Sequence, residues 1–341
     1  MSMRNGTQSE VVVITGASAG VGRATVRAFA RRKAAIGLLA RDTQGLQAAA
    51  REVTEAGGRA LALPTDVADP EAVEEAAERI EQELGPIDIW INVAMATIYA
   101  PLHRITPAEY RRATEVTYLG NVYGTMAALK RMRARNRGTI VQVGSALAYR
   151  SIPLQAPYCG AKFAIRGFTD SLRSELLHDG IDVHLTMVQM PALNTPQFDW
   201  GLNKLPNRPQ PVPPIYQPEV AAEAIVFAAY ARRREVWVGA STIKAILGNK
   251  LAPGLLDRYL AQAGYSGQRS GEAADPGAPN NLFEPVPGDY GARGRFDNRA
   301  QPRSLALWAS MHKHSLLAGA GMLGLALLSA ALTTRRAVRG S

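Results

Sequence analysis

The feature that most constrains the fold is a glycine-rich turn between a strand and a helix near the N terminus. Residues 11–15 form an apolar, β-branched run that is typical of a buried strand. The turn Thr-Gly-Ala-Ser-Ala-Gly-Val-Gly follows at 15–22, and apolar residues then recur at helical spacing through Ala30. Glycines let the backbone approach a pyrophosphate, whose charge the helix N terminus attracts. The pattern favours a dinucleotide site; a plain turn is the alternative.

Short apolar runs and amphipathic helices keep alternating after this turn, as far as residue 263. Such alternation predicts an α/β fold with a doubly wound parallel sheet of Rossmann type, in a single domain over residues 10–263. The further strands are expected at 36–40, 60–63, 87–91, 139–143, 183–188 and 235–238, and the further helices at 43–56, 70–84, 106–135 (bent), 158–177, 218–231 and 242–263.

The residues after the second and third strands bear on which nucleotide is bound. Arg41 follows the second strand. At this position a cation can pair with the 2′-phosphate of NADP, whereas a carboxylate can accept a hydrogen bond from the 2′-hydroxyl of NAD. The cation nearest the strand end favours NADP, although Asp42 follows it. Asp66 and Val67 follow the third strand, where the aspartate either receives the adenine amino group or caps the next turn.

A second group of chemically useful residues lies between 143 and 168. Ser145 ends an apolar run, and Tyr158 and Lys162 lie one turn apart on the helix that follows. A tyrosine phenol has an ordinary pKa of about 10, and a nearby ammonium group favours the phenolate. A serine hydroxyl across a cleft then holds a carbonyl or alcohol oxygen while the tyrosine moves its proton. An ordinary buried helix is the alternative for the Tyr-Lys pair taken alone.

Taken together, these elements resemble the short-chain dehydrogenase/reductase family, from the 15–22 turn to Ser145 and the Tyr-Cys-Gly-Ala-Lys run. The resemblance implies hydride transfer between NAD(P) and a carbonyl/alcohol pair. It makes Tyr158 the general acid/base and Ser145 the holder of the substrate oxygen, while Lys162 tunes Tyr158 and holds the nicotinamide ribose. The cofactor residues that it implies are Gly16, Ser18, Gly20, Val21, Asp66, Val67, Asn92, Ala94, Tyr158, Lys162, Pro191 and Thr195.

Three positions depart from the family pattern. Met95 replaces a glycine near the cofactor, and Ala192 replaces the glycine that often follows Pro191. Thr117 stands where the family has a catalytic asparagine, whose backbone carbonyl holds a proton-relay water; Asn121 is the alternative if the alignment slips. These departures leave a second hypothesis open, that of a non-catalytic NADP(H) sensor or scaffold at a membrane.

Composition and charge limit the classes of partner and the compartment, but they do not indicate a substrate. One cysteine, Cys159, excludes an internal disulfide and fits a reducing compartment. Residues 1–10 are too polar for a signal peptide, and residues 1–9 are expected to form a flexible N terminus. The net charge of +10 suits anionic partners, but the basic run at 130–137 lacks interleaved aromatic residues, so we expect no nucleic-acid partner. No metal site is predicted, and the resemblance implies a homo-oligomer.

The C-terminal part changes composition twice. Residues 264–314 are rich in Gly, Pro, Ala and charge, which predicts a flexible linker with Phe283, Tyr290 and Phe296 as candidates for docking. Residues 315–332 carry no charge and reach about 27 Å as a helix, which favours a membrane anchor over an interface helix, followed by a basic tail at 333–341. The expected protein is a cytoplasmic NADP(H)-dependent oxidoreductase anchored by its C terminus, acting on a lipophilic ketone or alcohol.

Overall fold

The structure, a computed structural model, describes residues 9–313, 315 and 316. Residues 9–304 belong to one compact unit, and a second unit begins at Leu305. The described part of the second unit holds the short helix α11 (Leu305–Met311), after which the His312 ring stacks on Trp308 at 4.7 Å.

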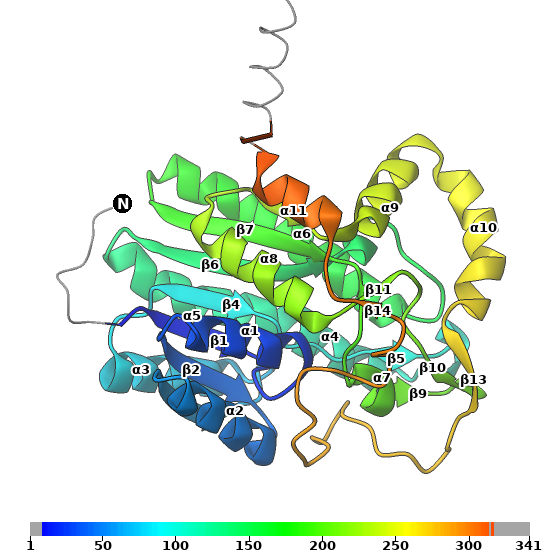
Figure 1. Cartoon of the computed structure of the whole chain (residues 1–341), viewed down its shortest axis with the longest axis horizontal. Coiled ribbons are helices and arrows are strands. Elements are labelled where there is room, and N and C mark those ends of the chain that lie inside the picture. Colours follow the sequence, from blue (N-terminus) through cyan, green and yellow to red (C-terminus); the bar gives the residue numbers. More distant parts are fainter. Residues whose placement is uncertain (1–8, 314, 317–341) are drawn as a thin grey trace, which may run out of the picture. The chain divides into compact units, whose positions relative to one another are not determined.

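A seven-stranded sheet forms the centre of the first unit, and all of its neighbouring strands are parallel (Figure 1). Its strand order is β12-β7-β6-β4-β1-β2-β3. The chain adds β2 and β3 on one side of β1 and then β4, β6, β7 and β12 on the other, as expected for a doubly wound sheet. All residues of β1 and β2 are buried, because helices cover both faces of the sheet. The strands are β1 (Val11–Thr15), β2 (Ala35–Ala40), β3 (Arg59–Pro64), β4 (Ile89–Asn92), β6 (Gly138–Ser145), β7 (Val183–Met190) and β12 (Glu235–Trp237).

Helices cover the two faces in separate groups. Helices α1, α2 and α8 pack together on one face, and α3 to α6 pack on the other, over a core that includes Trp90, Ile80 and Ile140. Helices α9 and α10 follow β12, the last strand of this sheet along the chain. The bounds are α1 (Gly20–Ala30), α2 (Thr43–Glu55), α3 (Pro70–Leu84), α4 (Pro107–Thr114), α5 (Gly120–Ala134), α6 (Ala156–His178), α8 (Pro218–Tyr230), α9 (Gly239–Leu251) and α10 (Pro253–Ser266).

The predicted fold class is confirmed, and so is the bend in the long helix. A capping box between Thr106 and Glu109 starts α4, and a π-helical turn, Glu115–Leu119, separates α4 from α5. Within that turn the Thr117 hydroxyl accepts a hydrogen bond from the Ala96 N–H at 3.0 Å and donates one to its carbonyl at 2.9 Å. One hydroxyl therefore ties the bend to the segment that follows β4.

The segment predicted as a flexible linker is instead folded as far as residue 304. Strand β13 (Arg269–Ala273) pairs with β10 (Asn207–Pro209), and β14 (Ala300–Gln301) pairs with β11 (Ile215–Tyr216), which also pairs with β8 (Ala192–Leu193). Composition misled the prediction, because a few buried side chains and many backbone hydrogen bonds hold this segment.

The aromatic residues singled out in that segment behave differently from one another. Phe296 is buried against Phe198, whereas Phe283 is half exposed. Tyr290 keeps 39% of its surface exposed but packs edge-on against Trp200. Docking therefore involves two of the three.

The predicted membrane anchor at 315–332 lies outside the described residues, apart from its first two positions. Among residues 9–313, 315 and 316, no helix has both the length and the apolar character needed to cross a membrane. Membrane anchoring stays a prediction from the sequence.

Replacing Thr117 by valine should lower the free energy of unfolding by about 2 kcal/mol, because two buried backbone groups of Ala96 lose their partner. Urea unfolding of the two proteins measures the difference. Thr54→Val serves as the control, since Thr54 is an exposed residue on α2 whose loss should cost no more than about 0.5 kcal/mol. Equal stability of Thr117→Val and the wild type would contradict the assigned role.

Candidate active site

A cavity of about 400 Å³ opens at the carboxyl ends of the sheet strands. Doubly wound sheets bind their ligands at this edge, beside the strand where the order reverses. The wall includes the glycine turn, the carboxyl ends of β2, β3, β4, β6 and β7, the starts of α6 and α9, the loop after β7 and part of the C-terminal segment. The cavity is large enough for a small organic ligand.

The glycine turn has the conformation that a close backbone approach requires. Gly16 has a φ of +67°, and a Cβ there would lie 2.9 Å from the Ala94 Cα. A Cβ on Gly22 would lie only 1.9 Å from the Gly16 carbonyl oxygen. These two positions exclude any other residue, so β1, the turn and the segment after β4 can pack backbone to backbone. Ser18, Gly20 and Val21 complete the turn and line the cavity.

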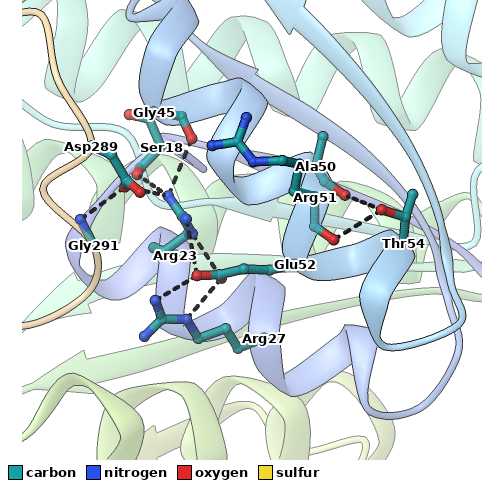
Figure 2. A network of polar contacts seen from close by, with 10 residues as sticks. All are labelled: Ser18, Arg23, Arg27, Gly45, Ala50, Arg51, Glu52, Thr54, Asp289 and Gly291. Atoms are coloured by element: carbon teal, nitrogen blue, oxygen red, sulfur yellow. Dashed lines mark hydrogen bonds and ion pairs between the residues drawn. The ribbon is translucent and has the colours of Figure 1, made fainter.

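The buried cation Arg23, whose role the sequence did not indicate, stabilises this turn through hydrogen bonds. Arg23 is 1% exposed and forms a bidentate ion pair with Glu52 at 2.8 and 3.0 Å (Figure 2). It also donates to the carbonyls of Ser18 and Gly45 and to the Asp289 carboxylate. Burial raises the pKa of Glu52, but its hydrogen bonds and charge interactions with Arg27 and Arg23 outweigh that effect and lower the pKa to about 2.

Two arginines lie at the end where the adenosine of a dinucleotide would bind. Arg41 lines the cavity, and burial lowers its pKa, with Asp66 opposing this effect and Arg112 adding to it. Arg112 forms an ion pair with Asp66. Asp42 caps α2 by accepting hydrogen bonds from Gln44 and Gly45. The cationic side chain is therefore the one presented at the end of β2, while the neighbouring carboxylate is engaged by its own helix.

Ser145, Tyr158 and Lys162 meet at the other end of the cavity. Ser145 is the last residue of β6, and its hydroxyl accepts a hydrogen bond from the Leu147 N–H at 3.1 Å. Lys162 is 3% exposed, and its Nζ donates to the Val143 carbonyl at 2.6 Å and lies 5.4 Å from the centre of the Tyr158 ring. Strand β6 and helix α6 thus supply the whole set.

The pKa shifts in this set differ from the simple expectation. Burial raises the pKa of Tyr158 well above its usual value, whereas a hydrogen bond with Ser145 lowers it. Burial also lowers the pKa of Lys162, to about 8. The expected lowering of the Tyr158 pKa by Lys162 is therefore not seen. A phenol protonated at neutral pH is suited to donating a proton to a carbonyl oxygen.

Two of the predicted site residues do not line the cavity. Asn92 is buried in a hydrogen-bonded network, accepting from the Trp90 indole and donating to Thr125 and Gln142. Thr117 holds the backbone of Ala96 instead. The predicted residues that do line it are Gly16, Ser18, Gly20, Val21, Arg41, Asp66, Val67, Ala94, Ser145, Tyr158, Lys162, Pro191 and Thr195.

Comparison with known proteins settles the family. A family model described as short chain dehydrogenase matches residues 10–199. The uncharacterized oxidoreductase YxnA of Bacillus subtilis is 30% identical over 330 residues, which are 96% of this chain and 92% of that protein. This chain belongs to the short-chain dehydrogenases. The resemblance inferred from the sequence is confirmed, and with it an oxidoreductase of the Rossmann type.

Other matches cover smaller parts of this short-chain dehydrogenase. Human 17-beta-hydroxysteroid dehydrogenase 13 is 35% identical over 51% of this chain and 58% of its own. A metagenomic short-chain oxidoreductase solved with NADP has a TM-score of 0.57 and 26% identity, covering 68% of this chain and 97% of its own. An alcohol dehydrogenase from Thermococcus sibiricus, solved with 5-hydroxy-NADP, has a TM-score of 0.57 and 25% identity, covering 68% and 96%.

Part of the cavity wall comes from residues that sequence reasoning missed. Asn281, Pro285, Val286, Gly288 and Tyr290 line it, and all lie in the segment that composition marked as a linker. The only signal was the isolated aromatic residues of that segment. The proline-rich stretch after β7 also contributes to the wall, with the helix α7 (Gln197–Trp200) and Pro211–Pro213.

Turnover should fall as the pH rises through about 8, because Lys162 then loses its charge. Below that pH the ammonium group is retained, so the rate should be level there. A pH profile of ketone reduction from about pH 6 to about pH 10 measures the effect. Lys162→Arg keeps its positive charge throughout this range. If this variant is active, its turnover should therefore not fall above about pH 8. A wild-type profile that stays level through this range would contradict the role of the Lys162 charge.

Proposed function

We propose that this short-chain dehydrogenase transfers hydride between NADP(H) and a carbonyl/secondary alcohol pair, with Tyr158 as the general acid/base. The observation that carries the proposal is the meeting of Ser145, Tyr158 and Lys162 in the same cavity as the glycine turn. A nucleotide site and a proton-transfer group at one sheet edge are the two parts that such a reaction needs.

The choice of NADP over NAD rests on charge. Arg41 lines the cavity and lies close enough to Arg112 for their charges to interact, and Asp42 is occupied as a helix cap. A 2′-phosphate would find cations there, whereas a ribose hydroxyl would find no free carboxylate at the end of β2. The two solved structures named above contain NADP or a derivative of it, which agrees with this choice.

The chain's own residues have separate tasks in the reaction. Ser145 holds the substrate oxygen, and Tyr158 donates its phenolic proton to that oxygen during reduction. Lys162, fixed by the Val143 carbonyl, has two further N–H donors for the ribose hydroxyls and a positive charge that favours the tyrosinate left behind. NADPH supplies the hydride when it is bound. In the oxidative direction Tyr158 takes the proton from the alcohol instead.

The substrate that we propose is lipophilic and of substantial size. Apolar side chains make up much of the cavity wall, and the related hydroxysteroid dehydrogenase carries the name of a lipophilic substrate. A bulky apolar ketone or secondary alcohol suits this lining. The apolar residues of the wall include Leu147, Ile152, Leu193, Phe198, Trp200 and Val212.

The alternative of a non-catalytic sensor rested on Met95 and Thr117. Thr117 has a clear structural task, since its hydroxyl makes two hydrogen bonds that hold the helix bend. Met95 lines the cavity without displacing the Ser-Tyr-Lys set. The catalytic hypothesis is therefore the better supported of the two.

Removing the phenolic hydroxyl tests the chemistry. Tyr158→Phe should lower kcat by about 10²- to 10⁴-fold, because the substrate oxygen loses its proton donor, while the Kd for NADPH changes little. A panel of lipophilic ketones, followed by NADPH absorbance, measures this. Tyr110→Phe, at a partly exposed position on α4, is the matched control and should retain full activity. Substantial turnover by Tyr158→Phe would refute the assigned role.

The cofactor choice is tested at Arg41. Arg41→Ala should raise the Kd for NADPH about 10- to 100-fold more than the Kd for NADH, because only NADPH carries the phosphate. A smaller rise shared by both cofactors is expected, since Arg41 also donates to the carbonyls of Asn281 and Phe283. Fluorescence titration with each cofactor gives both constants. Arg51→Ala removes an exposed cation from α2 and should leave both unchanged. Equal losses for the two cofactors would show that Arg41 does not read the 2′-phosphate.

A further inference from the structure

Residues 281–297, which we call the strap, form part of the cavity wall. In Figure 1 the strap is the orange segment between β13 and β14. It passes from the adenosine end of the cavity to the loop that follows β7, and it makes contacts at both ends and in the middle.

Two arginines and one buried leucine hold the beginning of the strap. Arg41 donates to the carbonyls of Phe283 and Asn281, the former at 2.6 Å, and Arg112 donates to the carbonyl of Leu282 at 3.1 Å. The Leu282 side chain is fully buried in the main core. Three consecutive carbonyls are thus bound by the cations that we assign to the nucleotide phosphate. Arg41 keeps further N–H donors, because a guanidinium has five.

The middle of the strap is fixed to the glycine turn. The Asp289 carboxylate pairs with Arg23 at 3.1 Å and also accepts from the Gly291 N–H (Figure 2). The carbonyl of Gly291 accepts from the Gly20 N–H at 3.0 Å, at the first residue of α1. The same buried arginine therefore supports the turn and anchors the strap over it.

The end of the strap is fixed to the segment after β7. Arg295 forms an ion pair with Asp199, and Phe296 packs against Phe198. The Asp297 carboxylate accepts from the side-chain amides of Asn194 and Gln217, each at 2.9 Å. The strap thus joins the Arg41 end of the cavity to the segment that follows β7.

Between these anchors the strap faces the cavity itself. Its residues Asn281, Pro285, Val286, Gly288 and Tyr290 form part of the wall. Tyr290 packs edge-on against Trp200 of α7, with ring centres 4.5 Å apart, and both residues line the cavity.

We propose that the strap is part of the cofactor site and closes over bound NADP(H). This inference rests on the proposed function. A nucleotide between the glycine turn and the strap leaves only after contacts such as Asp289–Arg23 and Tyr290–Trp200 have opened. The strap therefore raises affinity mainly by slowing release, and cofactor exchange depends on its opening.

The test compares cofactor release from the full-length chain and two strap variants. Leu282→Ala weakens the anchor without changing a residue of the cavity wall, and Tyr290→Ala removes a wall residue from a partly exposed position. NADPH release is followed by fluorescence after mixing the complex with excess NADP⁺, and the Kd is measured by titration. Leu255→Ala is the matched control, since Leu255 is 68% exposed on α10.

Both strap variants should release NADPH at least about tenfold faster than the wild type, with a Kd raised to match, while the control is unchanged. Unchanged release from Tyr290→Ala would overturn the inference. This variant decides the test by itself if a thermal melt shows that Leu282→Ala does not fold. Tighter binding by either folded variant would overturn it too, because the strap would then compete with the nucleotide. Absence of NADPH binding by the wild type would instead reject the proposed function.

Discussion

The close backbone approach at the glycine turn is the constraint on which the rest of this molecule depends. Gly16 lies against Ala94 and Gly22 against Gly16, at separations that leave no room for a Cβ. This approach brings the first strand, the first helix and the segment after β4 together at one edge of the sheet. The opening above them is the cavity, and the Ser-Tyr-Lys set reaches the same opening from β6 and α6. Changing either glycine would disturb the binding site and the sheet edge together.

Buried charge is the second organising element, and it links parts of the chain that are distant in sequence. Arg23 connects the glycine turn to α2 through Glu52 and to the C-terminal segment through Asp289. Arg41 and Arg112 hold the same segment at the adenosine end. Leaving a buried cation unpaired is costly, so these arginines favour a single arrangement of the C-terminal segment. A segment with few apolar residues is thereby held by polar contacts.

The sequence was sufficient for the parts of the fold that follow local rules. Strand β1 and helix α3 have the bounds that their patterns predict, and Tyr158 and Lys162 lie one turn apart on α6 as expected. The sequence did not indicate contacts in which a side chain's partner lies far along the chain. Asn92 belongs to a buried network with Thr125 and Gln142, and Leu282 owes its burial to a core built from other elements. No local pattern encodes such partners, and composition alone marked the strap as a linker.

The measurement that tests this account most directly is a fluorescence titration of the purified full-length wild-type chain with NADPH and with NADH. It requires no knowledge of the substrate, and it examines the cavity, the charge at the end of β2 and the cofactor together. The account predicts saturable binding of NADPH with a Kd at least about tenfold lower than that for NADH. Binding of neither cofactor, or a clear preference for NADH, would contradict it.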